Sequence, residues 1–161
     1  MKKILIITLA VLLAVPALAQ DSYATKSIEY GARAGATFGP DQFHFGAHAD
    51  LGQVIEGTRL VPNIEIGLGD HQKTFSFAGD LLYDFHARPF SVGGELALLY
   101  SKLDLDLPSG VEADDSITDL GLSVLGNYRL ALNNGKDLTF ELKVGLVDSP
   151  DFKVSVLYNL F

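Results

Sequence analysis

The sequence predicts an all-β protein in which eight antiparallel strands close into an up-and-down transmembrane barrel. Three observations lead to this fold class. Apolar residues recur at every second position in segment after segment, which is the period of a β-strand. Charged residues within these segments occupy the alternate positions, so each strand has one apolar and one polar face. The aromatic residues of the apolar faces gather at the strand ends and leave the middles to small and aliphatic residues.

The N-terminus predicts a secretory signal peptide, residues 1–19, that is cleaved before the barrel of residues 20–161. A positive pair, Lys2 and Lys3, precedes an apolar run, and the triplet Ala17-Leu18-Ala19 supplies small residues at a cleavage site. The alternative is a retained anchor helix. The apolar run is too short to span a bilayer as a helix, so we favour cleavage.

The composition excludes several classes of protein. The chain has 161 residues, 48% of them hydrophobic, and no cysteine. The missing cysteines exclude a disulfide scaffold, a cysteine nucleophile, a thiolate metal site and a lipidated cysteine. Because acidic residues outnumber basic ones by 20 to 12, we expect no nucleic-acid partner.

Turn-forming residues divide the chain after the leader into the eight expected strands. They include Gly39-Pro40-Asp41, Gly69-Asp70-His71, Arg88-Pro89, Asn133-Asn134-Gly135-Lys136 and Asp148-Ser149-Pro150-Asp151. In chain order the expected strands are residues 28–38, 42–51, 60–69, 74–86, 90–102, 117–132, 138–147 and 152–161. Strands of about 10 residues suit a tilted crossing of a bilayer.

The apolar faces predict two aromatic girdles, with both termini on the periplasmic side. The periplasmic girdle would contain Tyr30, Tyr83, Phe85, Phe90, Tyr128, Phe140 and Tyr158. The extracellular girdle would contain Phe38, Phe43, Phe45, Phe75, Phe77, Tyr100 and Phe152. Between the girdles the apolar faces hold no charge, as the outer face of a barrel in lipid requires. A soluble barrel with the apolar faces inside is the alternative, but a narrow interior would mix large and small residues along each strand.

With its leader, eight alternating strands and last strand from Phe152 to Phe161, the chain resembles the small eight-stranded outer-membrane barrels. These are the proteins of the outer-membrane protein X type and the transmembrane domain of outer-membrane protein A. The resemblance implies an integral outer-membrane protein and a barrel-assembly machinery that reads a C-terminal aromatic residue, here Tyr158 or Phe161. The outward alternation ends at Leu160, so Phe161 is out of phase and predicts a bulge or register change near Asn159.

The polar faces are expected to line the lumen with a charge network. Its members are Glu29, Arg33, His44, His48, Asp50, Glu65, Asp80, Asp84, His86, Glu95, Asp119, Arg129, Glu141, Lys143 and Lys153. If Phe38 lies opposite Phe43, Arg33 lies opposite His48, and a similar count places Arg129 diagonal to Glu141. Carboxylates exceed fixed cations in this set, so some groups carry extra protons or the lumen keeps water. A plugged lumen is favoured, and a narrow cation-preferring pore is the alternative.

The sequence predicts no cofactor, no metal site and no enzymatic activity. His44 and His48 lie about 13 Å apart along one strand, too far to bind one ion. Two pairs, His48 with Asp50 and Asp84 with His86, could each supply two ligands, but no zinc-type spacing accompanies them. Some small barrels modify lipid A, and His86, Ser91 and Glu95 would be the residues for such chemistry, but their spacing does not match those enzymes.

One long loop carries an acidic cluster, Asp104, Asp106, Glu112, Asp114 and Asp115, within residues 104–116. It predicts either a solvated surface loop or divalent-cation bridging to lipopolysaccharide phosphates. The connection at residues 52–59 is long for a periplasmic turn, and an inverted orientation would exchange the sides of the two loops. The partners expected are outer-membrane lipids, lipopolysaccharide and the barrel-assembly machinery, with the barrel a monomer.

Overall fold

The structure, a computed structural model, describes residues 28–70, 72–85, 89–103 and 116–160. These residues form nine strands: β1 (Glu29–Phe38), β2 (Gln42–Asp50), β3 (Gln53–Ile55), β4 (Thr58–Leu68), β5 (Gln72–Asp84), β6 (Phe90–Leu103), β7 (Ser116–Ala131), β8 (Asp137–Val147) and β9 (Phe152–Asn159). The expected signal peptide, the acidic residues of the long loop, His71, His86 and Phe161 lie outside the described residues. The part of the chain that is described contains no helix able to cross a membrane.

The strands close into one antiparallel barrel. Neighbours in the sheet follow the order β2-β1-β9-β8-β7-β6-β5-β4-β3, and pairing of β2 with β4 closes the ring. The first and last strands therefore meet, and Gly31 lies opposite Asn159 at one end of their pairing. The predicted eight-stranded up-and-down barrel is confirmed, with β3 as a short addition.

Strand β3 accounts for the long connection at residues 52–59. It pairs with the start of β4, where Gln53 lies opposite Arg59 and Ile55 opposite Thr58. Gly57 makes the turn with a φ of +73°, a conformation that glycine adopts without strain. The connection is thus a small hairpin, and β4 begins two residues before the strand expected from Leu60.

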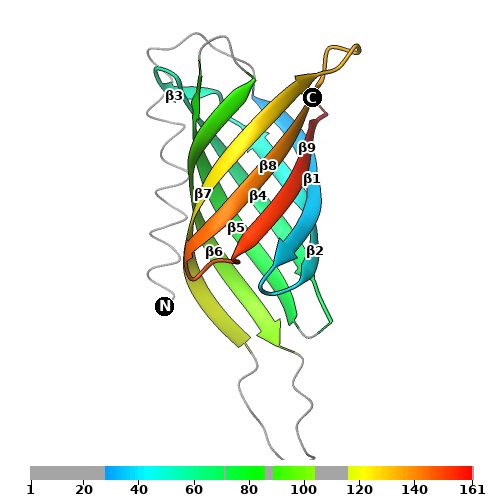
Figure 1. Cartoon of the computed structure of the whole chain (residues 1–161), viewed down its shortest axis with the longest axis vertical. Helices are drawn as coiled ribbons and strands as arrows, with labels where there is room; N and C mark the ends of the chain where they lie inside the picture. The colour runs from blue at the N-terminus through cyan, green and yellow to red at the C-terminus, as the bar shows by residue number, and fades with distance from the viewer. Residues whose placement is uncertain (1–27, 71, 86–88, 104–115, 161) are drawn as a thin grey trace, which may run out of the picture.

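The barrel has two ends that differ in what they carry. We call the end where β1 starts and β9 ends the terminal rim, and the opposite end the loop rim. Figure 1 shows β3 and the end of β9 together at the terminal rim, with the β1–β2 and β8–β9 turns at the loop rim. The sides of the membrane on which these rims lie depend on the orientation proposed below.

The outer surface of the barrel is apolar over its height. Aromatic residues of both predicted girdles project outward, with Phe43 78% exposed and Tyr30 53% exposed. Phe90, Tyr128 and Phe140 follow one another in register across β6, β7 and β8 at the terminal rim, and the Phe90 and Tyr128 rings lie 5.0 Å apart. Apolar area of this extent needs a nonpolar surrounding, which lipid provides and water does not.

The interior combines a polar network with a small apolar cluster. Val61, Leu82 and Leu125 are buried together inside the barrel, and Asp80 lies two residues before Leu82 on the same face of β5. The sequence predicted charged side chains on the inward face of the strands, but it did not predict this apolar cluster. Both kinds of side chain fill the narrow interior of an eight-stranded barrel.

Candidate functional site

The middle of the lumen contains a buried ionic cluster, which we call the central layer. It is formed by Arg33 on β1, Glu65 on β4, Asp80 on β5, Glu95 on β6, and Glu141 and Lys143 on β8. All six residues are buried, and Asp80 has no exposed surface. Their strands surround the lumen, so the side chains converge from opposite walls onto the barrel axis.

Arg33 connects three strands across the lumen. Its Nε lies 2.6 Å from a Glu65 oxygen, its Nη1 lies 3.4 Å from Asp80 Oδ2, and its Nη2 pairs with Glu141. A guanidinium suits this position because its planar fork can meet several carboxylates at once. The guanidinium of Arg33 therefore links β1 to β4, β5 and β8.

Lys143 is the second cation of the central layer. Its Nζ lies 2.9 Å from Asp80 Oδ1 and 3.5 Å from a Glu141 oxygen, and it also pairs with Glu95. Asp80 therefore accepts from both cations, and Asn63 donates to it from 3.2 Å. Burial of charged groups is tolerated here because every carboxylate of the layer has a cationic partner.

The packing of β2 against β4 beside the central layer depends on a glycine. Gly46 lies directly opposite Arg33 in the β1–β2 pairing. A Cβ at Gly46 would lie 1.9 Å from the Ile64 carbonyl oxygen and 2.9 Å from Glu65 Cγ. The close packing of β2 against β4 at the central layer therefore requires a residue without a side chain.

We expect Gly46→Ala to lower the free energy of unfolding by about 1–3 kcal/mol, because overpacking would displace β4 and Glu65. Urea unfolding of the barrel in bilayers measures the change. Gly126→Ala is the matched control, since a Cβ at Gly126 meets no atom within 4 Å. Equal stability of the two variants would contradict the packing argument.

A second ionic group lies toward the terminal rim. Arg59 Nη1 lies 2.6 Å from Asp50, and its Nε lies 3.0 Å from Asp84. Arg59 also donates to the Ser91 hydroxyl over 3.4 Å, and Asp50 accepts the Gly52 backbone N–H at 2.9 Å. The expected network lacked Arg59 because the strand was expected to begin at Leu60. Asn63 and Glu65 face the lumen, and Arg59 lies four residues before Asn63 in the same alternation. Extending the expected strand back to Arg59 would therefore have placed its side chain inside.

Other predicted lumen residues near this rim have local partners. His48 hydrogen-bonds Asn159 at 2.9 Å, and Asn159 donates to half-buried Glu29 at 2.6 Å. Arg129 lies 3.8 Å from Asp137. These contacts fix side chains against the wall and leave a cavity of only about 20 Å³ beside them.

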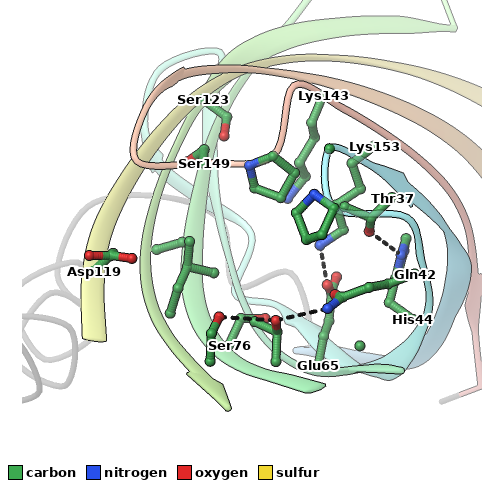
Figure 2. Close-up of a pocket in the computed structure, with 18 of the residues that line it drawn as sticks. Thr37, Gln42, His44, Glu65, Ser76, Asp119, Ser123, Lys143, Ser149 and Lys153 are labelled. Atoms are coloured by element: carbon green, nitrogen blue, oxygen red, sulfur yellow. Dashed lines mark hydrogen bonds and ion pairs between the residues drawn. The ribbon is translucent and has the colours of Figure 1, made fainter. Parts of the chain in front are cut away.

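The lumen is wider between the central layer and the loop rim. A cavity of about 220 Å³ lies there, which we call the vestibule, and its wall is rich in hydroxyl and amide groups. Figure 2 shows Thr37 bonded to His44 and Lys153 directed at Glu65, with Ser123 and Ser149 on the other wall. Asp119 lines the vestibule as well. The vestibule shares no lining residue with the small cavity near the terminal rim, so the central layer lies between them.

The first expected pairing, Arg33 opposite His48, needs correction. Arg33 lies opposite Gly46, and His48 lies opposite Gly31, because Ala36 rather than Phe38 pairs with Phe43. Both registers keep the same residues inside, so alternation alone could not distinguish them.

The second pairing concerns Arg129. It lies diagonal to Glu141, as predicted, because Asn127 is opposite Glu141 and Thr139 is opposite Arg129. However, Arg129 pairs with Asp137, while Glu141 is bound by Arg33 across the lumen. The sequence-based count considered only neighbouring strands and missed partners on the opposite wall.

Ser91 and Glu95, two of the residues considered for hydrolysis, are held in other contacts. Among the described residues, no three histidine or carboxylate side chains are arranged to hold a metal ion. Ser91 accepts a hydrogen bond from Arg59, and Glu95 pairs with Lys143. Ser91 and Glu95 therefore belong to different ionic groups.

Comparison with known proteins gives a match at the level of fold. No protein-family model matches the sequence, and no curated protein matches it. Among solved structures, Neisserial surface protein A (NspA) aligns with a TM-score of 0.56 and 17% identity, covering 83% of this chain and 96% of that one.

Two further structures align more weakly. The Yersinia pestis outer membrane protein Ail aligns with a TM-score of 0.47 and 8% identity, covering 83% of this chain and 100% of that one. The outer membrane enzyme PagL aligns at 0.42 with 16% identity, covering 83% and 99%. The alignment with NspA, whose TM-score exceeds 0.5, shows that the described residues share the fold of that outer-membrane barrel.

Proposed function

We propose that the chain is a non-enzymatic integral protein of a bacterial outer membrane whose lumen is plugged by the central layer. It would act in membrane structure or in surface interaction, with the terminal rim and both termini periplasmic. Barrel-assembly machinery would insert it as a monomer, and lipopolysaccharide would surround its outer half. The apolar outer surface and the aromatic rows at its rims support the membrane location.

One observation supports the proposal that the lumen is plugged. Arg33 and Lys143 are buried between carboxylates from four strands, and they separate the vestibule from the cavity near the terminal rim. Val61 and Leu82 add apolar bulk on the terminal side. An ion crossing this region would have to displace paired charges and pass a nonpolar constriction, both of which oppose conduction.

A narrow cation-preferring pore is the second candidate. Four carboxylates, Glu65, Asp80, Glu95 and Glu141, face three cations, Arg33, Lys143 and Lys153, around the central layer. This negative surplus would favour cations if the lumen opened. The vestibule already supplies an entrance at the loop rim.

Conductance in a planar bilayer under a salt gradient distinguishes the two candidates. We expect the inserted wild-type barrel to be silent, because the central layer closes the lumen. Glu65→Gln and Asp80→Asn are tested alongside, with Lys136→Gln, a turn residue outside the lumen, as the control. Steady cation-selective steps that the two carboxylate variants weaken would establish the pore and overturn the plug.

A further inference from the structure

The vestibule is hollow because a row of small side chains faces it. Ala78 on β5, Ala97 on β6 and Gly121 on β7 lie opposite one another in register on the inner side of the sheet. The rows on either side carry larger side chains, namely Asp80, Glu95 and Ser123 toward the terminal rim and Ser76, Leu99 and Asp119 toward the loop rim. The small row leaves the lumen unfilled at its height, and the cavity of about 220 Å³ lies there.

Two turns bound the mouth of the vestibule. Its lining includes Gly39 and Pro40 from the β1–β2 turn and Asp148, Ser149 and Pro150 from the β8–β9 turn. A Cβ at Gly121 would overlap Ser149 Oγ, and a Cβ at Gly145 would overlap the Pro150 carbonyl oxygen. These two glycines therefore allow the β8–β9 turn to pack against the inner side of the wall and to narrow the mouth.

Polar groups on the β7 side of the vestibule are left for a ligand. Within the described part of the chain, half-buried Asp119 and buried Ser123 make no hydrogen bond or ion pair. Ser149 Oγ is buried without a hydrogen-bond partner. Figure 2 shows the three side chains along one wall of the cavity. Buried polar groups without partners are costly, and a ligand with hydroxyl groups would supply the missing hydrogen bonds.

The wall formed by β2, β5 and β6 holds a fixed hydrogen-bond chain. Gln42 Nε2 donates to the Thr74 hydroxyl and to the Gln72 carbonyl oxygen, each over 3.1 Å, and Gln72 Nε2 donates to Thr74 over 3.3 Å. The Thr74 hydroxyl thus accepts two N–H groups, so it donates its own hydrogen to Ser101, 3.1 Å away. The hydrogen of the Ser101 hydroxyl is then left to donate to a ligand.

This donor and the Asp119 acceptor lie on neighbouring strands. Ser101 is opposite Ile117 in the β6–β7 pairing, so it is diagonal to Asp119, and such positions lie about 7–8 Å apart. A ring with hydroxyl groups around its edge can reach both. Leu99, Pro40 and Pro150 add apolar surface to the lining, against which the C–H groups of such a ring can pack.

The charges of the vestibule disfavour an anion. Lys143 pairs with Glu95 and Lys153 pairs with Glu65, so the two lysines of the lining are already neutralised. Asp119 adds a negative charge without a cationic partner among the described residues. Pockets for drug-sized ligands have about 300–1,000 Å³. The vestibule is smaller and suits one neutral sugar ring.

We propose that the vestibule binds one neutral pyranose residue, with Asp119 accepting from ring hydroxyls and Ser101 and Ser123 completing the contacts. The central layer closes the far end, so the sugar binds without passing through the barrel. This site deepens the proposed role in surface interaction and rests on it. With the loop rim outside the cell, the pyranose is a free monosaccharide or the end residue of a glycan.

Saturation-transfer NMR on the full chain, refolded in an amine-oxide detergent that carries no sugar, measures binding of glucose, galactose and N-acetylglucosamine. At least one of them is expected to bind. Asp119→Ala should weaken that binding about 10- to 100-fold, because hydrogen bonds to a charged group are lost. Asp41→Ala is the matched control and should bind as the wild type does, since Asp41 is an exposed carboxylate of the same rim outside the vestibule lining. Absence of binding by all three sugars would overturn the proposal.

A second variant fills the cavity and keeps every polar group. Ala97→Leu places a larger side chain in the small row, so it should abolish sugar binding while heat-dependent gel mobility still reports a folded barrel. If Asp119→Ala and Ala97→Leu bind the sugar as tightly as Asp41→Ala does, the sugar lies elsewhere and the proposed site is wrong. Tighter binding of glucuronate or of putrescine than of any neutral sugar would also refute it, because the ligand would then be recognised by its charge.

Two further arms separate the sources of the sugar and the two proposals. A methyl glycoside and a trisaccharide ending in the bound sugar should bind as the free sugar does if the ligand is the end of a glycan, whereas binding by the free sugar alone would support a monosaccharide. Sugar influx into vesicles that contain the barrel tests the plug separately. Influx through the wild type would refute the plugged lumen and leave the site, whereas neither influx nor binding would refute the site and leave the plug.

Discussion

Replacing Arg33 by Met is expected to lower the free energy of unfolding by about 3–5 kcal/mol, because it leaves buried carboxylates without their shared partner. Arg33 contacts Glu65, Asp80 and Glu141, and all four side chains are almost fully buried. Water cannot easily replace the guanidinium in a filled interior. Urea unfolding of the bilayer-inserted barrel, followed by tyrosine fluorescence and by heat-dependent gel mobility, measures the loss.

A double variant tests whether unpaired charge is the cause. Arg33→Met with Glu141→Gln removes one positive and one negative group that contact each other, so part of the lost stability should return. Arg33→Lys keeps the positive charge but lacks the planar guanidinium that contacts several carboxylates at once. Its stability should lie between those of wild type and Arg33→Met. If Arg33→Met is as stable as the wild type, the lumen is hydrated enough to screen its carboxylates. That result would favour the pore over the plug.

The faces of the strands could be predicted from the sequence because they depend on parity alone. A residue such as Glu65 shares its side of the sheet with Asn63 whatever the neighbouring strand does. The closure of the barrel could also be predicted from the sequence. An open sheet in lipid would leave the backbone N–H and C=O groups of its edge strands without partners, and a closed ring of an even number of strands pairs them. These inferences need no distances between strands.

The partners within the lumen could not be predicted in the same way. Shifting β1 against β2 by two residues keeps every side chain on its face but moves Arg33 from His48 to Gly46. The contacts of Arg33 with Asp80 and of Lys143 with Glu95 cross the lumen, so they also depend on strand tilt and on the stagger accumulated around the ring. Neither the strand tilt nor the stagger can be predicted from the sequence pattern of a single strand.

Replacing Leu96 by Arg is expected to destabilise the inserted barrel by about 2–4 kcal/mol, the cost of an arginine on the lipid face near the bilayer midplane. Leu96 is 44% exposed on the outer face of β6, between the girdle residues Phe90 and Tyr100. It lies opposite Gly79 and Leu122, so no neighbouring side chain can pair with the new charge. The arginine would have to reach the interface or draw water into the hydrocarbon region.

Thr118→Arg is the matched control, because the cost of an outward-facing arginine depends on its depth in the bilayer only if this face lies in lipid. Thr118 faces outward on β7 in the same row as Tyr100, at the level of the loop-rim girdle. There an arginine should cost only about 0–1 kcal/mol. Urea unfolding in bilayers of both variants gives the difference. On a water-facing surface, Leu96→Arg would relieve apolar exposure and cost no more than Thr118→Arg, so equal stabilities would contradict the transmembrane barrel. A cost confined to Leu96 would show that the middle of this face lies in hydrocarbon and its rim in the headgroup layer.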